Sequence, residues 1–429
     1  MRGSSRAGRG VASRGATQQS SAPYNRRIVL DVIRRAGRIS RREIVERVHL
    51  SPQTVANITN DLQAIGLIVA RRSGGTRSRG QPPIAFELNP DAGHSIGISL
   101  EPGRLAAALV NLVGDVLERR EVPIDTHDPR RTLEAMVAHI EALRVLPARS
   151  GRLFGVGIAL PGPLVRTDIS FVGPTALEGW SDLSVFDALR EATRLQVFYS
   201  VDSVAGALGE MLFGVARTLD NFFYMHFGLG LGGALVVNRS AYRGADGNAT
   251  EIGHIPLVPG GRPCYCGNAG CLERYLSLHS LAEALGLDDV RGREAEVVSA
   301  LASGSSPALE SWCEEAAARL RDAIGVIENM LDPLTVVIGG SAPKALVTHL
   351  VARSQPLHPS VRGGVERPFE RILLSERQEE SSILGAAVLP IFELLAPRLE
   401  VLQQEESRRG TSAVEDLMGQ RDSARAGRL

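Results

Sequence analysis

Residues 251–273 read EIGHIPLVPGGRPCYCGNAGCLE and hold three of the four cysteines in a chain of 429 residues. Three thiols and one imidazole form the donor set of a closed tetrahedral zinc site, which leaves no position open for water. Glycines in the loop allow the tight turns that bring four donors together. The alternatives are a disulfide or unrelated buried thiols, but a chain this poor in cysteine, without a secretory signal, is typical of a reducing compartment. The sequence therefore predicts a structural Zn2+ ion bound by His254, Cys264, Cys266 and Cys271.

The same stretch resembles the signature of the ROK family, which contains sugar kinases, repressors and uncharacterised open reading frames. Glu-x-Gly-His is followed by Cys-x-Cys-Gly-x-x-Gly-Cys-x-Glu, and the resemblance extends over about residues 25–395. It implies that the metal shapes a loop which presents Glu251, His254 and Glu273 to a sugar. Carboxylates suit this role because each oxygen accepts a charge-assisted hydrogen bond from a hydroxyl group. The alternative is that these carboxylates are ordinary solvated surface groups.

Charge is divided unevenly along the chain, although the formal net charge is zero. Residues 1–80 contain 16 arginines and four acidic residues, a balance of +12, so the remainder carries −12. A basic segment joined to an acidic body indicates that only the first part contacts a polyanion. The sequence has no apolar run of membrane-spanning length, and its arginine-rich start lacks the apolar segment of a signal peptide. We therefore expect a cytoplasmic protein that does not engage a membrane.

Residues 25–66 show three helical patterns separated by short turns. The second begins with a capping box at Ser40 and Glu43, and the third begins with Ser51 followed by proline. Strands are expected over residues 67–70 and 83–88, with an arginine-rich hairpin between them. Three helices and a basic hairpin predict a winged helix-turn-helix with its third helix in the major groove of double-stranded DNA; the alternative is a small helical interaction domain. The residues expected to contact DNA are Ser51, Gln53, Thr54 and Asn57 on the third helix and Arg71, Arg72, Arg77 and Arg79 in the wing.

From about residue 94 the pattern changes to α/β. Strand and helix patterns alone support only that class, but the duplicated arrangement resembles the two-lobed actin and sugar-kinase fold, which is ribonuclease H-like, with a ligand cleft between the lobes. The expected strands cover residues 96–100, 105–112, 116–124, 154–160, 197–201, 221–227, 233–237, 335–338 and 371–374, and the expected helices cover 132–146, 203–213 and 381–395. The expected organisation is a disordered arm over 1–22, a winged helix-turn-helix over 23–88, a two-lobed sugar-binding domain over 89–398 and a disordered tail over 399–429.

A kinase of this family would need two nucleotide-phosphate loops and a carboxylate base. The first loop normally reads Asp-x-Gly-Gly-Thr, but here Ser99 stands in place of the acid and Glu101-Pro102-Gly103 completes the loop, where proline removes a donor amide. The second loop keeps its glycines but has Leu229 in place of threonine. Asp202 matches the family's sugar-facing base, with the N-cap of the following helix as the plainer interpretation. The resemblance therefore implies a sugar ligand at Asp202, a vestigial base, and no phosphoryl transfer.

Taken together, the sequence favours a DNA-binding regulator that forms a homodimer or a higher homo-oligomer. The preferred hypothesis is a repressor of carbohydrate uptake or catabolism genes that binds operator DNA and responds to a sugar or sugar phosphate. One alternative is a hexose kinase, using ATP, with an appended DNA-binding module. Another is a DNA-binding protein whose sugar domain serves only as a dimerisation scaffold, because Val201 replaces an asparagine that binds sugar in the family.

Overall fold

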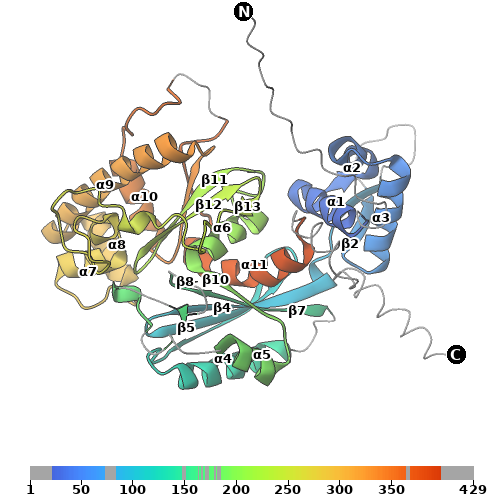
Figure 1. Cartoon of the computed structure of the whole chain (residues 1–429), viewed down its shortest axis with the longest axis horizontal. Coiled ribbons are helices and arrows are strands. Elements are labelled where there is room, and N and C mark those ends of the chain that lie inside the picture. Colours follow the sequence, from blue (N-terminus) through green and yellow to red (C-terminus); the bar gives the residue numbers. More distant parts are fainter. Residues whose placement is uncertain are drawn as a thin grey trace, which may run out of the picture.

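The computed structural model describes residues 22–72, 84–146, 151–162, 164–165, 168–169, 173–177, 180, 185–363 and 368–397. The predicted tail over 399–429, the wing residues Arg77 and Arg79, and the predicted arm apart from Ala22 lie outside the described residues. Ala22 begins the first helix. Figure 1 shows a small helical domain beside a larger body of two lobes, and helix α11 lies between the two lobes.

The N-terminal domain is a winged helix-turn-helix. Ser40 caps the second helix through the predicted box, in which the Ser40 N–H donates to Glu43 over 2.8 Å. Ser51 caps the third helix and accepts from the Thr54 N–H at 3.1 Å. A further strand of two residues, Ile39–Ser40, pairs with the wing. The sequence did not predict it, because two residues are too few to show a period. The elements are α1 (Ala22–Ala36), β1 (Ile39–Ser40), α2 (Arg41–Val48), α3 (Pro52–Ala64), β2 (Ile68–Arg72) and β3 (Ile84–Leu88), with sheet order β1-β3-β2.

The first lobe is built on a five-stranded sheet of order β10-β7-β4-β5-β6. One face packs on α4 and α5, through alternate residues such as Ile96 and Ile98. The other face packs on α11, whose backbone comes so close that a Cβ at Gly97 or Gly157 would lie within 2.4 Å of a helix carbonyl oxygen. The last helix therefore packs on the first lobe. The elements are β4 (Gly93–Glu101), β5 (Arg104–Asn111), β6 (Val116–Pro123), α4 (Pro129–Arg144), β7 (Arg152–Leu160), α5 (Val185–Thr193), β10 (Val197–Val201) and α11 (Ser381–Leu395).

The second lobe has a sheet of order β13-β12-β11-β14-β15. Alternate residues of β11 point to opposite faces, so Phe223 and Met225 pack on α7, α9 and α10, whereas Phe222 and Tyr224 pack on α6. Helix α6 crosses α11 closely at Gly209 and Gly385. The elements are α6 (Asp202–Phe213), β11 (Phe222–Phe227), β12 (Leu231–Val237), β13 (Ser240–Ala241), α7 (Leu278–Leu285), α8 (Glu294–Ser303), α9 (Pro307–Leu331), β14 (Val336–Gly339), α10 (Lys344–Arg353) and β15 (Ile372–Leu374).

Short elements complete the described chain. Strands β8 (Leu164–Val165) and β9 (Asp168–Ile169) form a small hairpin, and single 3-10 turns cover Pro90–Ala92, Gly173–Thr175, Ile252–His254, Leu272–Arg274 and Gln378–Glu380. Across the part of the chain that the structure describes, no helix combines the length and apolar character needed to cross a bilayer.

Candidate functional site

The four predicted metal ligands lie together. The donor atoms of His254, Cys264, Cys266 and Cys271 all fall within 4.8 Å of one another. His254 Nδ1 is 3.6 Å from the Cys264 sulfur, and the sulfurs of Cys266 and Cys271 are 3.7 Å apart. Bonds of about 2.3 Å from zinc to sulfur place two sulfurs of a tetrahedron roughly 3.8 Å apart, so this spacing fits a tetrahedral ion and excludes a disulfide. The cluster is therefore able to hold a metal ion.

The thiols of this cluster gain from a bound cation. Burial, with the neighbouring Cys264 and Cys266 thiols, raises the pKa of Cys271 to about 12. A thiol with so high a pKa keeps its proton at neutral pH, whereas a divalent ion stabilises the thiolate directly. The turn of the cysteine loop requires glycine at position 270. Gly270 has a φ of 81° and lies so close to the Val258 carbonyl that a Cβ would be 1.7 Å from its oxygen.

The predicted sugar ligands line one cavity between the lobes. Asp202, Glu251, His254 and Glu273 all face a cavity of about 50 Å3. Asp202 comes from the start of α6, and the other three come from the 3-10 turns on either side of the cysteine loop. The structure thus brings together four residues that are up to 71 positions apart in the sequence.

The electrostatics of this cavity favour a ligand rich in hydroxyl groups. The pKa of Glu251 is raised to about 7, mainly by burial; His254 lowers it, and the nearby Asp202 and Glu273 carboxylates contribute to the rise. Burial also raises the pKa of Glu273, although its Oε2 accepts a hydrogen bond from the Leu231 N–H at 2.9 Å. Carboxylates crowded in this way are costly without donors, and hydroxyl groups supply donors.

Asp202 does not cap α6. The helix begins at Asp202 itself, Val201 is the N-cap residue, and no side-chain capping bond is present. Asp202 Oδ1 instead accepts from the Ser203 N–H at 2.6 Å, and Oδ2 lies 3.7 Å from Nε2 of His226. The capping interpretation is therefore wrong, because the N-cap position lies one residue earlier, at Val201, and the Asp202 carboxylate lines the cavity.

Besides the predicted ligands, the cavity is lined by further polar residues, including one on β11 and one after β14. His226 on β11 and Ser341 after β14 both line it, and the His226 Nδ1 and Ser341 Oγ atoms are buried without a hydrogen-bond partner. Buried polar atoms without partners are rare in proteins and often mark a ligand site. The only signal in the sequence was a histidine inside an otherwise apolar strand, which a core histidine explains equally well.

The loop at the predicted phosphate position is bridged across the lobes. Arg291, between α7 and α8, donates to the Pro102 carbonyl at 2.9 Å, and its guanidinium is 3.5 Å from Glu101. Asp289 also pairs with this guanidinium, at 2.6 Å. Arg291 therefore joins the loop of the first lobe to the second lobe beside the cavity.

The expected DNA contacts lie on the exposed start of α3 and on the wing. The side chains of Gln53 and Asn57 are exposed and hydrogen-bonded to each other at 2.9 Å. The Ser51 and Thr54 hydroxyls lie 2.8 Å apart at the helix start. On the wing, the exposed Arg71 pairs with Glu87 at 2.8 Å, and Arg72 is also exposed.

The architecture defines a class of protein: a winged helix-turn-helix joined to a two-lobed, sugar-kinase-like domain. The chain belongs to the ROK family, whose sequence model matches residues 95–391, and the model described as winged helix-turn-helix DNA-binding matches residues 24–69.

Three relatives show what the chain resembles, and the first matches over most of its length. A putative xylose repressor from Caldicellulosiruptor sp. (strain Rt8B.4) is 26% identical over 388 residues, which cover 87% of this chain and 96% of that protein. The xylose repressor of Bacillus subtilis (strain 168) is 29% identical over 262 residues, 61% of this chain and 67% of its own length. A glucokinase from Halalkalibacterium halodurans is 30% identical over 267 residues, 58% of this chain and 81% of its own length.

A solved structure shares the whole architecture. The crystal structure of a ROK family transcriptional regulator, described as a homologue of the Escherichia coli MLC protein, aligns with a TM-score of 0.67 and 24% identity. It covers 90% of this chain and 100% of that one, which confirms the fold predicted from the sequence.

Proposed function

We propose that this chain is a DNA-binding transcriptional repressor that responds to a sugar or sugar phosphate bound between its lobes. One observation supports this proposal above the others: a winged helix-turn-helix and a cavity lined by four sugar-type ligands occur in one chain. A putative xylose repressor that matches over 87% of the chain and a xylose repressor that matches over 61% of it support the proposal. The genes it controls would then serve carbohydrate uptake or catabolism.

The cavity would bind the effector through its carboxylates. Asp202, Glu251 and Glu273 accept from sugar hydroxyls in charge-assisted hydrogen bonds. His254 faces the thiols through Nδ1, which leaves Nε2 for the sugar. His226 and Ser341 add two polar atoms that have no protein partner.

A zinc ion held by His254, Cys264, Cys266 and Cys271 would serve a structural role. Four protein donors fill its coordination sphere, so the ion supplies rigidity and no Lewis-acid chemistry. Because His254 belongs to both sites, the metal cluster would fix the position of one sugar ligand.

Kinase activity is the alternative suggested by the glucokinase relative. The loop at the phosphate position speaks against it, because Pro102 lacks an amide donor and Glu101 places a carboxylate where phosphate would lie. Arg291 already bridges this loop to the second lobe. We therefore assign Asp202 a role in binding alone, as a vestigial base.

Regulation would follow from movement of the lobes. The cavity is lined by residues of both lobes, so a sugar that contacts both would favour one arrangement of the lobes over another. An effector shifts such an equilibrium only by its differential affinity for the two states, and a 100-fold preference corresponds to about 2.7 kcal/mol. A homodimer is expected, since one winged helix-turn-helix reads a single half-site.

The test compares operator affinity with and without effector. The operator is the duplex that the wild-type protein selects from a random pool, and the probes are D-xylose, D-glucose and their phosphates. At least one probe should change the affinity of the wild type but not that of Glu251→Ala. Glu134→Ala, an exposed residue of α4, is the matched control and should respond as the wild type does. If Glu251→Ala responds as well as the wild type, this cavity is not the sensor.

A further inference from the structure

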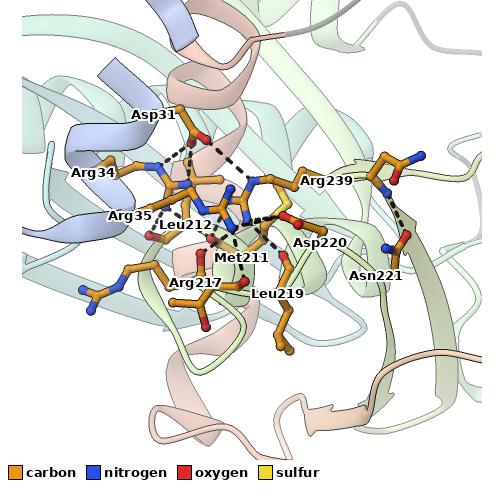
Figure 2. Close-up of polar contacts among 12 residues, drawn as sticks. Asp31, Arg34, Arg35, Met211, Leu212, Arg217, Leu219, Asp220, Asn221 and Arg239 are labelled. Carbon is orange, nitrogen blue, oxygen red and sulfur yellow. Dashed lines mark hydrogen bonds and ion pairs between the residues drawn. The ribbon is translucent and has the colours of Figure 1, made fainter. Parts of the chain in front are cut away.

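Helix α1 of the DNA-binding domain lies across the ends of the two central helices. Arg34 donates from Nη1 to the carbonyls of Met211 at 3.2 Å and Leu212 at 2.7 Å, in the last turn of α6 (Figure 2). Arg27, two turns earlier on α1, donates to the carbonyl of Ala396, the C-cap residue of α11, at 3.2 Å. Residues seven apart lie on the same helix face, and an arginine near a helix C-terminus is stabilised by the helix dipole. One face of α1 therefore contacts the C-terminal ends of both α6 and α11.

These two helices belong to different lobes. Helix α11 packs on the sheet of the first lobe, and α6 packs on the sheet of the second. The two helices cross closely at Gly209 and Gly385, so a rotation of one lobe against the other that pivots at this crossing moves the two carbonyl ends relative to each other. An element fixed to both ends must tilt or release one of them.

A buried charge cluster reinforces the contact with the second lobe. Asp31 on α1 accepts from Arg34 at 2.6 Å and lies 3.7 Å from Nε of Arg239, which follows β12 (Figure 2). Arg239 also donates to the carbonyls of Leu219 at 2.9 Å and Met211 at 3.3 Å. The side chains of Asp31, Arg34 and Arg239 are only 10–15% exposed. Burial lowers the pKa of Arg239 to about 10, consistent with a charge that depends on its partners. Ion pairs so poorly solvated are costly to break, so this contact holds its geometry.

The elements that reach α1 begin in the sugar cavity. Helix α6 starts at Asp202, and its 12 residues span roughly 18 Å to the Arg34 contact. Strand β12 starts at Leu231, whose N–H donates to Glu273, and leads to Arg239. A displacement of cavity residues is therefore carried along two rigid elements to the same point on α1.

Helix α1 is also packed firmly against the recognition helix α3. Arg26 pairs with Asp61 of α3 at 3.2 Å, and Val29 and Ile33 share a buried core with residues of α3. A cavity of about 230 Å3 lies between α1, the end of α6 and the end of α11, which leaves room for α1 to shift.

We propose that α1 converts lobe movement into reorientation of the DNA-binding domain, with Arg27 and Arg34 as its contacts to the two lobes. This inference rests on the proposed function, because it names the route by which the sugar cavity would control operator binding.

The experiment uses the full chain with Arg34→Gln, Arg27→Gln and the surface control Arg130→Gln, which alters only an exposed ion pair on α4. Arg34→Gln and Arg27→Gln should bind D-xylose or D-glucose as the wild type does, by thermal shift. The effect of that sugar on operator affinity should fall from the roughly 5–150-fold typical of such coupling to below about 2-fold. Arg34→Lys keeps the charge and one donor, so it should restore part of the effect. The inference is overturned if Arg34→Gln keeps both sugar binding and the full effect.

A second readout needs no sugar. Because coupling is reciprocal, operator DNA should alter amide hydrogen exchange at residues 202–206 in the wild type and in Arg130→Gln, but not in Arg34→Gln. If no sugar changes operator affinity in the wild type, the effector hypothesis fails, and this exchange experiment still decides the role of α1. Equal exchange changes in the wild type and Arg34→Gln, or none in the wild type, would overturn it.

Discussion

Glu251→Gln should stabilise the protein at neutral and alkaline pH. Burial raises the pKa of Glu251 from its usual value of 4.5 to about 7. The native state therefore keeps a proton on this carboxyl group over a pH range in which the unfolded chain has lost it. Stability falls with pH wherever the native state binds more protons, so the wild type loses stability between about pH 4.5 and pH 7 and then levels off.

The magnitude follows from the size of the shift. One pKa unit corresponds to 1.36 kcal/mol, so this shift corresponds to about 3 kcal/mol of unfolding free energy. Solvent screening of a half-buried carboxylate lowers the expected loss of stability to roughly 2–3 kcal/mol. A loaded zinc site with three thiolates carries a net charge of −1, which acts in the same direction. Glutamine keeps the shape of the side chain without the charge, so it removes this cost.

Thermal melting at pH 5 and pH 8 measures the effect. The difference in melting temperature between Glu251→Gln and the wild type should be about 3–5 °C larger at pH 8 than at pH 5. This follows from an unfolding entropy of about 2.1 cal/mol/K per residue over the residues of the two lobes. Glu134→Gln, on the exposed face of α4, should follow the wild type at both pH values. A constant difference between Glu251→Gln and the wild type would show that Glu251 ionises as it would in water, and the electrostatic account of the cavity would be wrong.

Three further predictions concern the other sites. Metal analysis should give one zinc per chain, and Cys264→Ser and Cys271→Ser should lose both the zinc and thermal stability. The control Cys313→Ser, which alters a buried thiol outside the cluster, should keep its zinc. Zinc-free wild-type protein would refute the assignment. Gln53→Ala and Asn57→Ala should each reduce the free energy of binding to operator DNA by about 1–3 kcal/mol and change binding to random DNA little. Arg71→Ala should weaken binding to all DNA and reduce its dependence on salt concentration. Equal losses on operator and random DNA for all three variants would contradict the interface. A coupled ATP-turnover assay over a panel of sugars should show no sugar-dependent activity, and turnover abolished by Asp202→Asn would restore the kinase alternative.

Residues close together in the sequence carried most of what could be predicted. The metal ligands lie within 18 positions, and their chemical types alone select zinc. The caps at Ser40 and Ser51 depend on side chains three residues away, so they were predicted and confirmed. The start of α6 was misplaced by one residue, which changed Asp202 from a possible cap into a residue of the cavity alone.

Tertiary structure decided the contacts between distant residues. His226 and Ser341 reach the cavity from β11 and from the end of β14, and no local pattern links them. Arg291 contacts the loop beside the cavity from the connection between α7 and α8. Arg27 and Arg34 show the same limit: in the sequence they are two arginines on the polar side of a DNA-binding domain. Only the packed structure places the carbonyl ends of α6 and α11 against them. Periodicity and ligand chemistry are local properties that a sequence states directly, whereas the groups that face a given side chain are fixed by how sheets and helices pack.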